Sequence, residues 1–138
     1  MSTYIQNRIL EGEHQQQDFK FQVNDSRKIA RSLVAFANTN GGRLLIGVKD
    51  NGVIAGVSKD EEYHMIEAAS QLYCKPEISF ESKSHNVEGK TVLEIIVRPI
   101  ELKPCYALDE NNKWLAFIRV KDQNILASSV LVRYWKRL

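Results

Sequence analysis

Three carboxylates near the ends of expected strands are the side chains of this sequence best suited to catalysis. Glu13 and Asp18 lie just before or at the start of one such strand, and Asp50 follows another. Carboxylates from separate elements that meet at strand ends can bind Mg²⁺ or Mn²⁺, because these ions prefer carboxylate and water oxygens. An ion bound there would activate water and stabilise a phosphate under attack. The alternative interpretation is that all three are solvated surface charges, the usual state of acidic residues.

Basic residues form a second candidate set. Lys20 is expected on the same strand face as Asp18, and three further basic residues share a polar stripe on the helix that follows. Such an array can follow a phosphate backbone, with an affinity that depends on salt and not on base sequence. An ordinary charged helix face is the alternative. The complete set comprises Lys20, Arg27, Lys28, Arg31, Arg43, Lys49 and Arg119.

Other familiar sites are not indicated. Gly41-Gly42 precedes a strand and lacks the Lys-Ser/Thr of a phosphate-binding loop, so a helix stop is its expected role. The three histidines show no paired spacing, which argues against a histidine metal site or a Ser-His-Asp triad. Cys74 and Cys105 lack CxxC spacing and are expected to be small buried residues in a reducing cytoplasm.

The elements that must position these residues are clearest around the paired glycines. Apolar residues at helical spacing predict a helix over about residues 26–39, and an apolar run predicts a buried strand over 43–49. Alternation predicts a half-buried strand over 15–23, preceded by a short helix over about 3–10. The charged candidates therefore lie at the ends of elements that pack together.

The remainder of the chain is predicted to consist mostly of strands. The turn at Asn51-Gly52 predicts a hairpin from the strand over 43–49, and Pro76 is expected to end a second long helix. Ser128 or Ser129 is expected to cap a final helix whose Val130, Leu131, Tyr134 and Trp135 face inward. The other expected elements are a strand over 53–57, a helix over 59–75, a hairpin of strands around 78–81 and 92–97, and a hairpin that joins 106–108 to 115–120.

Length and composition fit one globular domain over residues 1–138. The chain is 43% hydrophobic and 26% charged, which is ordinary for a soluble protein. No apolar stretch approaches the roughly 20 residues that span a bilayer, and the N-terminus lacks the apolar core of a signal peptide. We therefore expect a cytoplasmic α+β domain without a membrane partner, in which a mixed or antiparallel sheet with β-hairpins is packed by about three helices.

Three motifs of the first half resemble the Schlafen AlbA-2 domain family. They are Glu13-x-x-x-x-Asp18-Phe19-Lys20, Ala35-Phe-Ala-Asn-Thr-Asn-Gly-Gly42 and Gly47-Val-Lys-Asp-Asn-Gly52. Downstream, Lys103-Pro104-Cys-Tyr106 and Phe117-Ile-Arg-Val120 are similar to later elements of the family. The resemblance covers the chain from about Glu11 to Leu138.

This resemblance implies a DNA- or RNA-binding module, which in bacterial relatives is often fused to a helicase-like, ATPase or winged-helix segment. Animal relatives use three acidic residues of this region as a metal-dependent endoribonuclease, and the matching positions here are Glu13, Asp18 and Asp50. Asp18 stands where the family usually has glutamate, and Lys49 stands where relatives often have a second acid. A lysine beside the proposed metal site would compete with the cation.

Three functions remain open from the sequence. The leading expectation is a module that binds DNA or RNA through the phosphate backbone and needs no cofactor for binding. The second is an endoribonuclease dependent on Mg²⁺ or Mn²⁺, and the third is a protein-interaction or regulatory domain that binds no nucleic acid. A role as a transcriptional regulator is a further expectation. A homodimer, as in the paired lobes of animal relatives, and a separate ATPase or regulatory partner also remain open.

Overall fold

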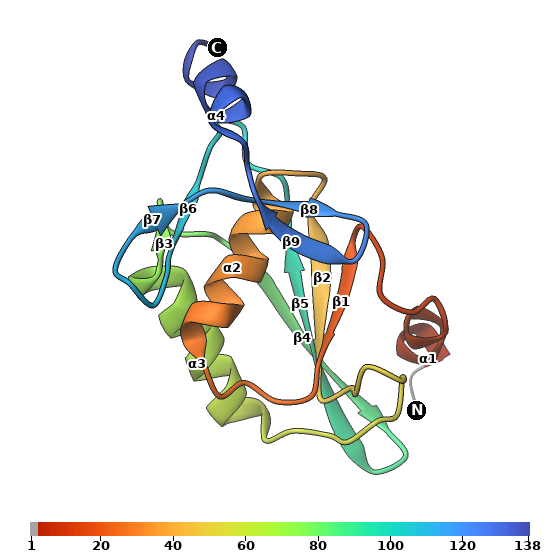
Figure 1. Ribbon diagram of the computed structural model, residues 1–138. Helices are drawn as coiled ribbons and strands as arrows, with labels where there is room; N and C mark the ends of the chain where they lie inside the picture. Colours follow the sequence, from red (N-terminus) through yellow and green to blue (C-terminus); the bar gives the residue numbers. More distant parts are fainter. Residues whose placement is uncertain (1–2) are drawn as a thin grey trace.

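A helix and a strand joined by the paired glycines form the centre of the fold, as the apolar pattern predicts. The computed structural model describes residues 3–138. Helix α2 (Ser26–Ala37) packs on a four-stranded sheet with the order β1-β2-β5-β4 (Figure 1). Its strands are β1 (Gln17–Lys20), β2 (Gly42–Ile46), β4 (Glu81–Val87) and β5 (Lys90–Val97). β1 and β2 are parallel, whereas the other two pairs are antiparallel.

Smaller elements surround this centre and complete the predicted α+β fold. β3, β6 and β7 form a three-stranded sheet, and β8 pairs with β9. Among residues 3–138, no helix is both long enough and apolar enough to cross a bilayer. The remaining elements are α1 (Thr3–Leu10), α3 (Lys59–Leu72), β3 (Cys74–Lys75), β6 (Tyr106–Leu108), β7 (Trp114–Leu115), β8 (Phe117–Val120), β9 (Gln123–Leu126) and α4 (Ser129–Lys136).

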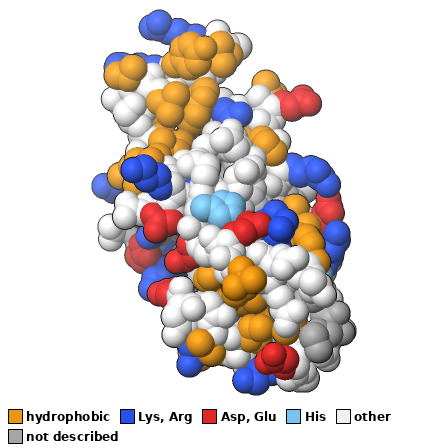
Figure 2. Space-filling model, turned by 90° about the vertical axis from the view of Figure 1, so that its right-hand side faces the viewer, with side chains coloured by type: hydrophobic (Ala, Val, Ile, Leu, Met, Phe, Trp, Pro, Cys, Tyr) orange, Lys and Arg blue, Asp and Glu red, His pale blue; other side chains and the backbone are white. Residues whose placement is uncertain are grey.

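Helix α4 begins where the sequence predicts, but it does not pack inward. Ser128 caps it by accepting a hydrogen bond from the Leu131 N–H at 3.1 Å. No residue of α4 is buried, and Tyr134 is 58% exposed. The helix projects from the domain in Figure 1, and hydrophobic side chains gather over it at the top of Figure 2. The predicted inward face is therefore wrong, because helical spacing locates an apolar stripe without showing that anything covers it.

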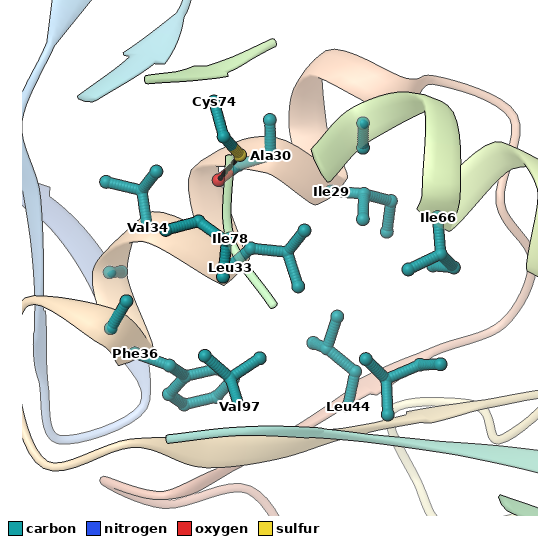
Figure 3. Packing of buried hydrophobic residues seen from close by; sticks show 14 of the residues in the cluster. Ile29, Ala30, Leu33, Val34, Phe36, Leu44, Ile66, Cys74, Ile78 and Val97 are labelled. Atoms are coloured by element: carbon teal, nitrogen blue, oxygen red, sulfur yellow. Dashed lines mark hydrogen bonds between the residues drawn. The ribbon is translucent and has the colours of Figure 1, made fainter. Parts of the chain in front are cut away.

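The core lies on both faces of the four-stranded sheet. Leu44 and Ile46 of β2 belong to the large cluster under α2, whereas Leu45 packs with Ile5 and Phe19 on the other face. Figure 3 shows the α2 side of this core, where Phe36 lies against Val97. Truncation of one such fully buried side chain to alanine typically costs about 2–5 kcal/mol. Strand β2 is thus held between two apolar layers, as its continuous apolar run predicts.

The paired glycines end α2 and let β2 pass close to it. Gly41 has a φ of +73°, and its N–H donates to the Phe36 carbonyl at 2.8 Å. A Cβ on Gly41 would lie 2.7 Å from the Val97 carbonyl oxygen, and one on Gly42 would lie 2.5 Å from the Phe36 ring. Both positions therefore require glycine, one for its backbone conformation and both for close approach.

Several predicted strands are shorter or differently paired. Residues 53–57 form only an isolated bridge between Val48 and Ile54, because the following residues hydrogen-bond to Gly47 and Thr91 and leave the hairpin. The strand expected around 78–81 begins only at Glu81. The hairpin expected from 106–108 to 115–120 is split, since β6 pairs with β7 and β8 pairs with β9.

Candidate functional site

The carboxyl ends of the parallel strands β1 and β2 bring predicted acidic and basic residues together. Asp18 and Lys20 lie on one face of β1, as alternation predicts, and Lys20 Nζ is 3.3 Å from Asp18 Oδ2. Asp18 is buried, whereas Lys20 is half-buried. In open sheets, the region outside the carboxyl ends of parallel strands is a common ligand-binding position. We call the residues at this end, Glu13, Lys20, Phe21, Lys49 and Asp50, the carboxyl-end surface.

Glu13 lies along the free edge of β1, the edge strand of the sheet. Its Oε2 accepts a hydrogen bond from the Phe19 N–H at 3.2 Å. Burial, a hydrogen bond with the Asp18 carboxyl group and the charges of Asp18 and Asp50 raise the pKa of Glu13 to about 7, against the opposing effect of the Phe19 N–H. Glu13 therefore exchanges a proton near neutral pH beside the Asp18 carboxyl group.

Glu13 and Asp18 meet at this end and Asp50 acts on Glu13 only through its charge, so the three predicted carboxylates do not form a ready metal site. Asp50 is exposed in the turn after β2, and its charge has the smallest effect on the pKa of Glu13. Within residues 3–138, no group of three or more His, Cys, Asp or Glu side chains is arranged to hold a metal ion. Two cations already contact Asp18, namely Lys20 and Arg119, whose Nη2 lies 3.7 Å from Asp18 Oδ1. This donor set, as arranged, does not fit Mg²⁺ or Mn²⁺.

Arg119 is a structural residue and not a phosphate contact, which corrects the sequence prediction. Arg119 is 2% exposed, and its guanidinium lies 5.1 Å from the centre of the Phe36 ring. The guanidinium donates to the carbonyl oxygens of His14 and Gln17 at 3.1 and 3.0 Å. It also donates to Asn124 Oδ1 at 2.9 Å. A buried arginine with these partners joins β8 to the segment that leads into β1.

The Asn-Thr pair after α2 extends these contacts. Asn38 Nδ2 donates to the carbonyl oxygens of Cys105 and Phe117 at 3.0 and 2.9 Å, and the Cys105 N–H donates back to Asn38 Oδ1 at 2.9 Å. Thr39 Oγ1 accepts from the Arg119 N–H at 2.9 Å. Asn38, Thr39 and Arg119 with these partners form what we call the Arg119 network. The Asn-Thr motif therefore ties α2 to the C-terminal half of the domain.

Arg43 belongs to a different cluster, on the sheet face that carries Leu45. Glu94 of β5 is fully buried there, and Arg43 Nε lies 3.6 Å from its Oε2. Tyr4 Oη donates to Glu94 Oε2 at 2.6 Å, and His85 Nε2 lies 2.8 Å from Glu94 Oε1. Burial and the hydrogen bond to Glu94 raise the pKa of the Tyr4 phenol. The sequence does not predict this cluster, and its one signal is that Glu94 is the single charged residue within the apolar run 92–97.

The basic stripe of α2 exists, but its arginines are engaged by neighbouring elements. Arg27 Nη1 donates to the Asp109 carbonyl oxygen at 2.6 Å. Arg31 Nη2 lies 3.5 Å from Glu110 Oε1 in the same β6–β7 loop. Lys28, between them in sequence, is exposed. The predicted stripe thus leaves Lys28 as its most accessible cation.

Lys49 and Phe21 are exposed at the carboxyl-end surface, as Asp50 is. Alternation predicts an inward Phe21, but β1 ends at Lys20 and the Phe21 ring is 49% exposed. The exposed Lys49 holds its Nζ 5.5 Å from the centre of that ring. Figure 2 views the molecule from the side where α1 lies, and it shows acidic and basic side chains intermingled there, without one continuous basic patch.

Comparison with known proteins gives a family match and two similar solved structures. Residues 13–128 match the family described as Schlafen, AlbA_2. The DIP2311 protein of Corynebacterium diphtheriae is 23% identical with a TM-score of 0.59, and the match covers 89% of this chain but only 24% of that one. The N-terminal domain of a protein from Nitrosomonas europaea, named as related to the ATP-dependent DNA helicase RecG, is 19% identical with a TM-score of 0.60. That match covers 92% of this chain and 89% of that domain. Both likenesses concern the fold alone, and among curated proteins none matches this sequence.

Proposed function

Because this chain belongs to the Schlafen AlbA_2 family, we propose that it binds DNA or RNA through the phosphate backbone at the carboxyl-end surface. One observation carries the proposal. Lys49, an exposed cation, stands beside the exposed aromatic ring of Phe21, directly outside the carboxyl ends of two parallel strands. The helicase-related name of the N. europaea neighbour supports a role with nucleic acid.

The charges at this end are compatible with a bound phosphate. Asp18 is paired with Lys20 and lies close to Arg119, so its negative charge is offset internally. Glu13 carries a proton for much of the time near neutral pH, because its pKa is raised to about 7. The carboxylate that opposes phosphate most directly is therefore that of the exposed Asp50.

The cations differ in how readily they could reach a phosphate. Lys49 and Lys28 are exposed, and Lys20 is half-buried beside Asp18. Arg27 and Arg31 would have to leave the β6–β7 loop, and Arg43 would have to leave Glu94. We therefore assign phosphate binding chiefly to Lys49 and Lys20 of the carboxyl-end surface, with Lys28 of α2 as a further contact.

Fluorescence anisotropy with labelled single-stranded RNA and DNA tests this function. We expect the affinity to fall steeply with added salt, because phosphate contacts release counterions. Lys20→Glu should weaken binding, and Arg31→Glu should weaken it less, since Arg31 already pairs with Glu110. Binding that is absent at low salt, or that is insensitive to salt, would contradict the proposal.

An endoribonuclease is the second candidate, and the position of Glu13 favours it. A carboxyl group that exchanges a proton near neutral pH beside two other carboxylates has the character of a general acid or base. Because the present arrangement does not fit a divalent ion, we derive no cleavage step, and the dependence on Mg²⁺ or Mn²⁺ stays a prediction. Incubation of transfer RNA with Mn²⁺ tests it: cleavage that is lost in Asp50→Ala would support the nuclease, and intact RNA would exclude it for this substrate.

The proposal also includes expectations about the setting in which the chain works. These are a homodimer, a separate ATPase or regulatory partner, a role in transcription and a cytoplasmic location. The exposed apolar face of α4 supports association with another protein chain. Single exposed apolar residues are ordinary, whereas an apolar helix face that nothing in the domain covers is typical of an interaction site. Sedimentation velocity decides the dimer: a mass near twice 15.8 kDa supports it, and a monomer at high concentration contradicts it.

A further inference from the structure

A cavity of about 570 Å³ opens beside Phe21 at the carboxyl-end surface. This volume lies within the roughly 300–1,000 Å³ range of small-molecule sites. Phe21 and Gln22 form one wall, residues 55–58 a second and residues 89–91 a third. None of these residues belongs to the acidic or basic sets predicted from the sequence.

Backbone hydrogen bonds hold the walls of this cavity in place. The Gly56 N–H donates to the Gly47 carbonyl oxygen at 3.0 Å, and the Val57 N–H donates to the Thr91 carbonyl oxygen at 3.0 Å. A Cβ on Gly56 would lie 3.0 Å from the Lys90 Cβ, so the two walls approach closely at that point. The cavity is therefore built by the fold itself and not by mobile side chains alone.

Glu62 lines the cavity, and one of its carboxylate oxygens has no hydrogen-bond partner among the described residues. This oxygen, Oε2, is buried. A buried acceptor without a donor is costly, and nearly all such atoms in folded proteins are paired. A ligand that brings an N–H group to this wall would remove that cost.

The Phe21 ring and the Lys49 ammonium complement two parts of one nucleotide. An exposed aromatic ring is the usual platform on which a base stacks, and a cation beside it neutralises the adjoining phosphate. Bases inside a duplex are already stacked, so only an unpaired base can reach such a platform. Amino groups of cytosine, adenine and guanine are donors that a glutamate can accept from, whereas uracil has no amino group.

From these observations we infer that the cavity is a nucleobase pocket for single-stranded nucleic acid. An unstacked base lies against Phe21, its amino group reaches Glu62, and the adjoining phosphate lies at Lys49. This inference rests on the proposed function, because it names the form of nucleic acid that the carboxyl-end surface binds. It adds a site that distinguishes single strands from duplexes and amino-bearing bases from uracil.

Binding of matched oligonucleotides to the full chain tests the pocket. Anisotropy is measured with single-stranded oligocytidine, oligouridine, an abasic strand of equal length and charge, and a duplex. We expect oligocytidine to bind most tightly, and Phe21→Ala to weaken it by roughly tenfold or more. Phe21→Trp should retain tight binding, whereas Glu62→Gln should remove the preference for oligocytidine over oligouridine.

Val53→Ala is the matched control. Val53 is an exposed apolar residue in the segment between β2 and α3, close in sequence to residues 55–58, but it does not line the cavity. It should leave every affinity unchanged, and circular dichroism checks that each variant is folded. An abasic strand that binds as tightly as oligocytidine, or a Phe21→Ala variant that binds like the wild type, overturns the pocket while phosphate binding stands. Absence of binding to all four probes at low salt overturns the proposed function and the pocket together.

Discussion

The carboxyl-end surface and the Arg119 network each place a cation beside a phenylalanine ring, with opposite results. Lys49 Nζ lies 5.5 Å from the exposed Phe21 ring, and the Arg119 guanidinium lies 5.1 Å from the buried Phe36 ring. Arg119 is surrounded by carbonyl oxygens and an asparagine that use its donors, whereas Lys49 reaches solvent. A cation beside a phenylalanine ring therefore holds the fold together in one region and is available to a ligand in the other.

This difference shows what residue type alone leaves open. Lys49 and Arg119 each belong to a motif that resembles the Schlafen AlbA-2 family, and the sequence predicts that both contact phosphate. What separates them is whether the charged head group is already neutralised by internal partners. Four predictions test the contrast, beginning with the largest expected effect.

Removal of the buried cation should damage stability. Arg119→Ala removes a buried guanidinium from two carbonyl oxygens, Asn124 and Asp18, so we expect the free energy of unfolding to fall by about 3–5 kcal/mol. Urea denaturation followed by circular dichroism measures this loss. Arg133→Ala, at an exposed arginine of α4, is the control and should change stability by less than about 0.5 kcal/mol. A small effect at Arg119 would mean that the network does not hold β8 to β1.

Removal of the exposed cation should damage binding instead. Lys49→Ala should weaken the affinity for RNA severalfold and reduce the slope of log affinity against log salt by about one, because one phosphate contact is lost. Its stability should change by less than about 0.5 kcal/mol. Lys83→Ala, at an exposed lysine on β4 at the opposite edge of the sheet, is the binding control. Equal effects of the two substitutions would contradict a localised phosphate site.

Acidity should affect the carboxyl-end surface through Glu13. Folding raises the pKa of this side chain from 4.5 to about 7, so the folded protein keeps a proton that the unfolded chain loses. Its contribution to stability is therefore complete below about pH 4.5 and is lost as the pH rises through about 7. Deprotonation of Glu13 also adds a negative charge near the phosphate site, so we expect RNA affinity to fall between about pH 6 and 8. Glu13→Gln keeps a neutral side chain and should flatten both the decline in stability and the loss of affinity. Urea midpoints and anisotropy across this range measure both, and parallel profiles for the variant and the wild type would show that Glu13 is not responsible.

The smallest effect is expected at α4. Tyr134→Ser replaces an exposed ring on a helix without buried residues, so the free energy of unfolding should change by less than about 0.5 kcal/mol. Leu33→Ala in the buried helix α2 should instead cost about 2–5 kcal/mol. A large loss at Tyr134 would show that α4 packs against a partner under the conditions of the measurement.

These two helices also show how far the sequence predicts the fold. Regular apolar spacing predicts both α2 and α4 and identifies the apolar face of each, since periodicity is a local property. It does not predict which face is covered, because that depends on residues far away in the chain. Leu33 belongs to a core cluster that includes Ile66 and residues further along the chain, and nothing within residues 3–138 buries Tyr134.

The candidate site divides in the same way. Alternation correctly places Asp18 and Lys20 on one face, because two residues of one strand suffice for that prediction. Arg119 and Glu94 could not be interpreted locally, since their partners lie up to 105 and 90 residues away. Alternation alone predicts an inward Phe21. The prediction is wrong because the end of β1 depends on distant residues, whose Gly47 and Val48 N–H groups donate to the Lys20 carbonyl oxygen.

Salt dependence of RNA binding tests the central claim most directly. Affinity of the wild type and of a Lys20→Ala/Lys49→Ala double variant for single-stranded RNA is measured between about 50 and 200 mM salt. We predict that the wild type loses about tenfold or more in affinity over this range, and that the double variant binds more weakly with a slope lower by about two. A wild type whose affinity ignores salt, or a double variant with the wild-type slope, would contradict phosphate binding at the carboxyl-end surface.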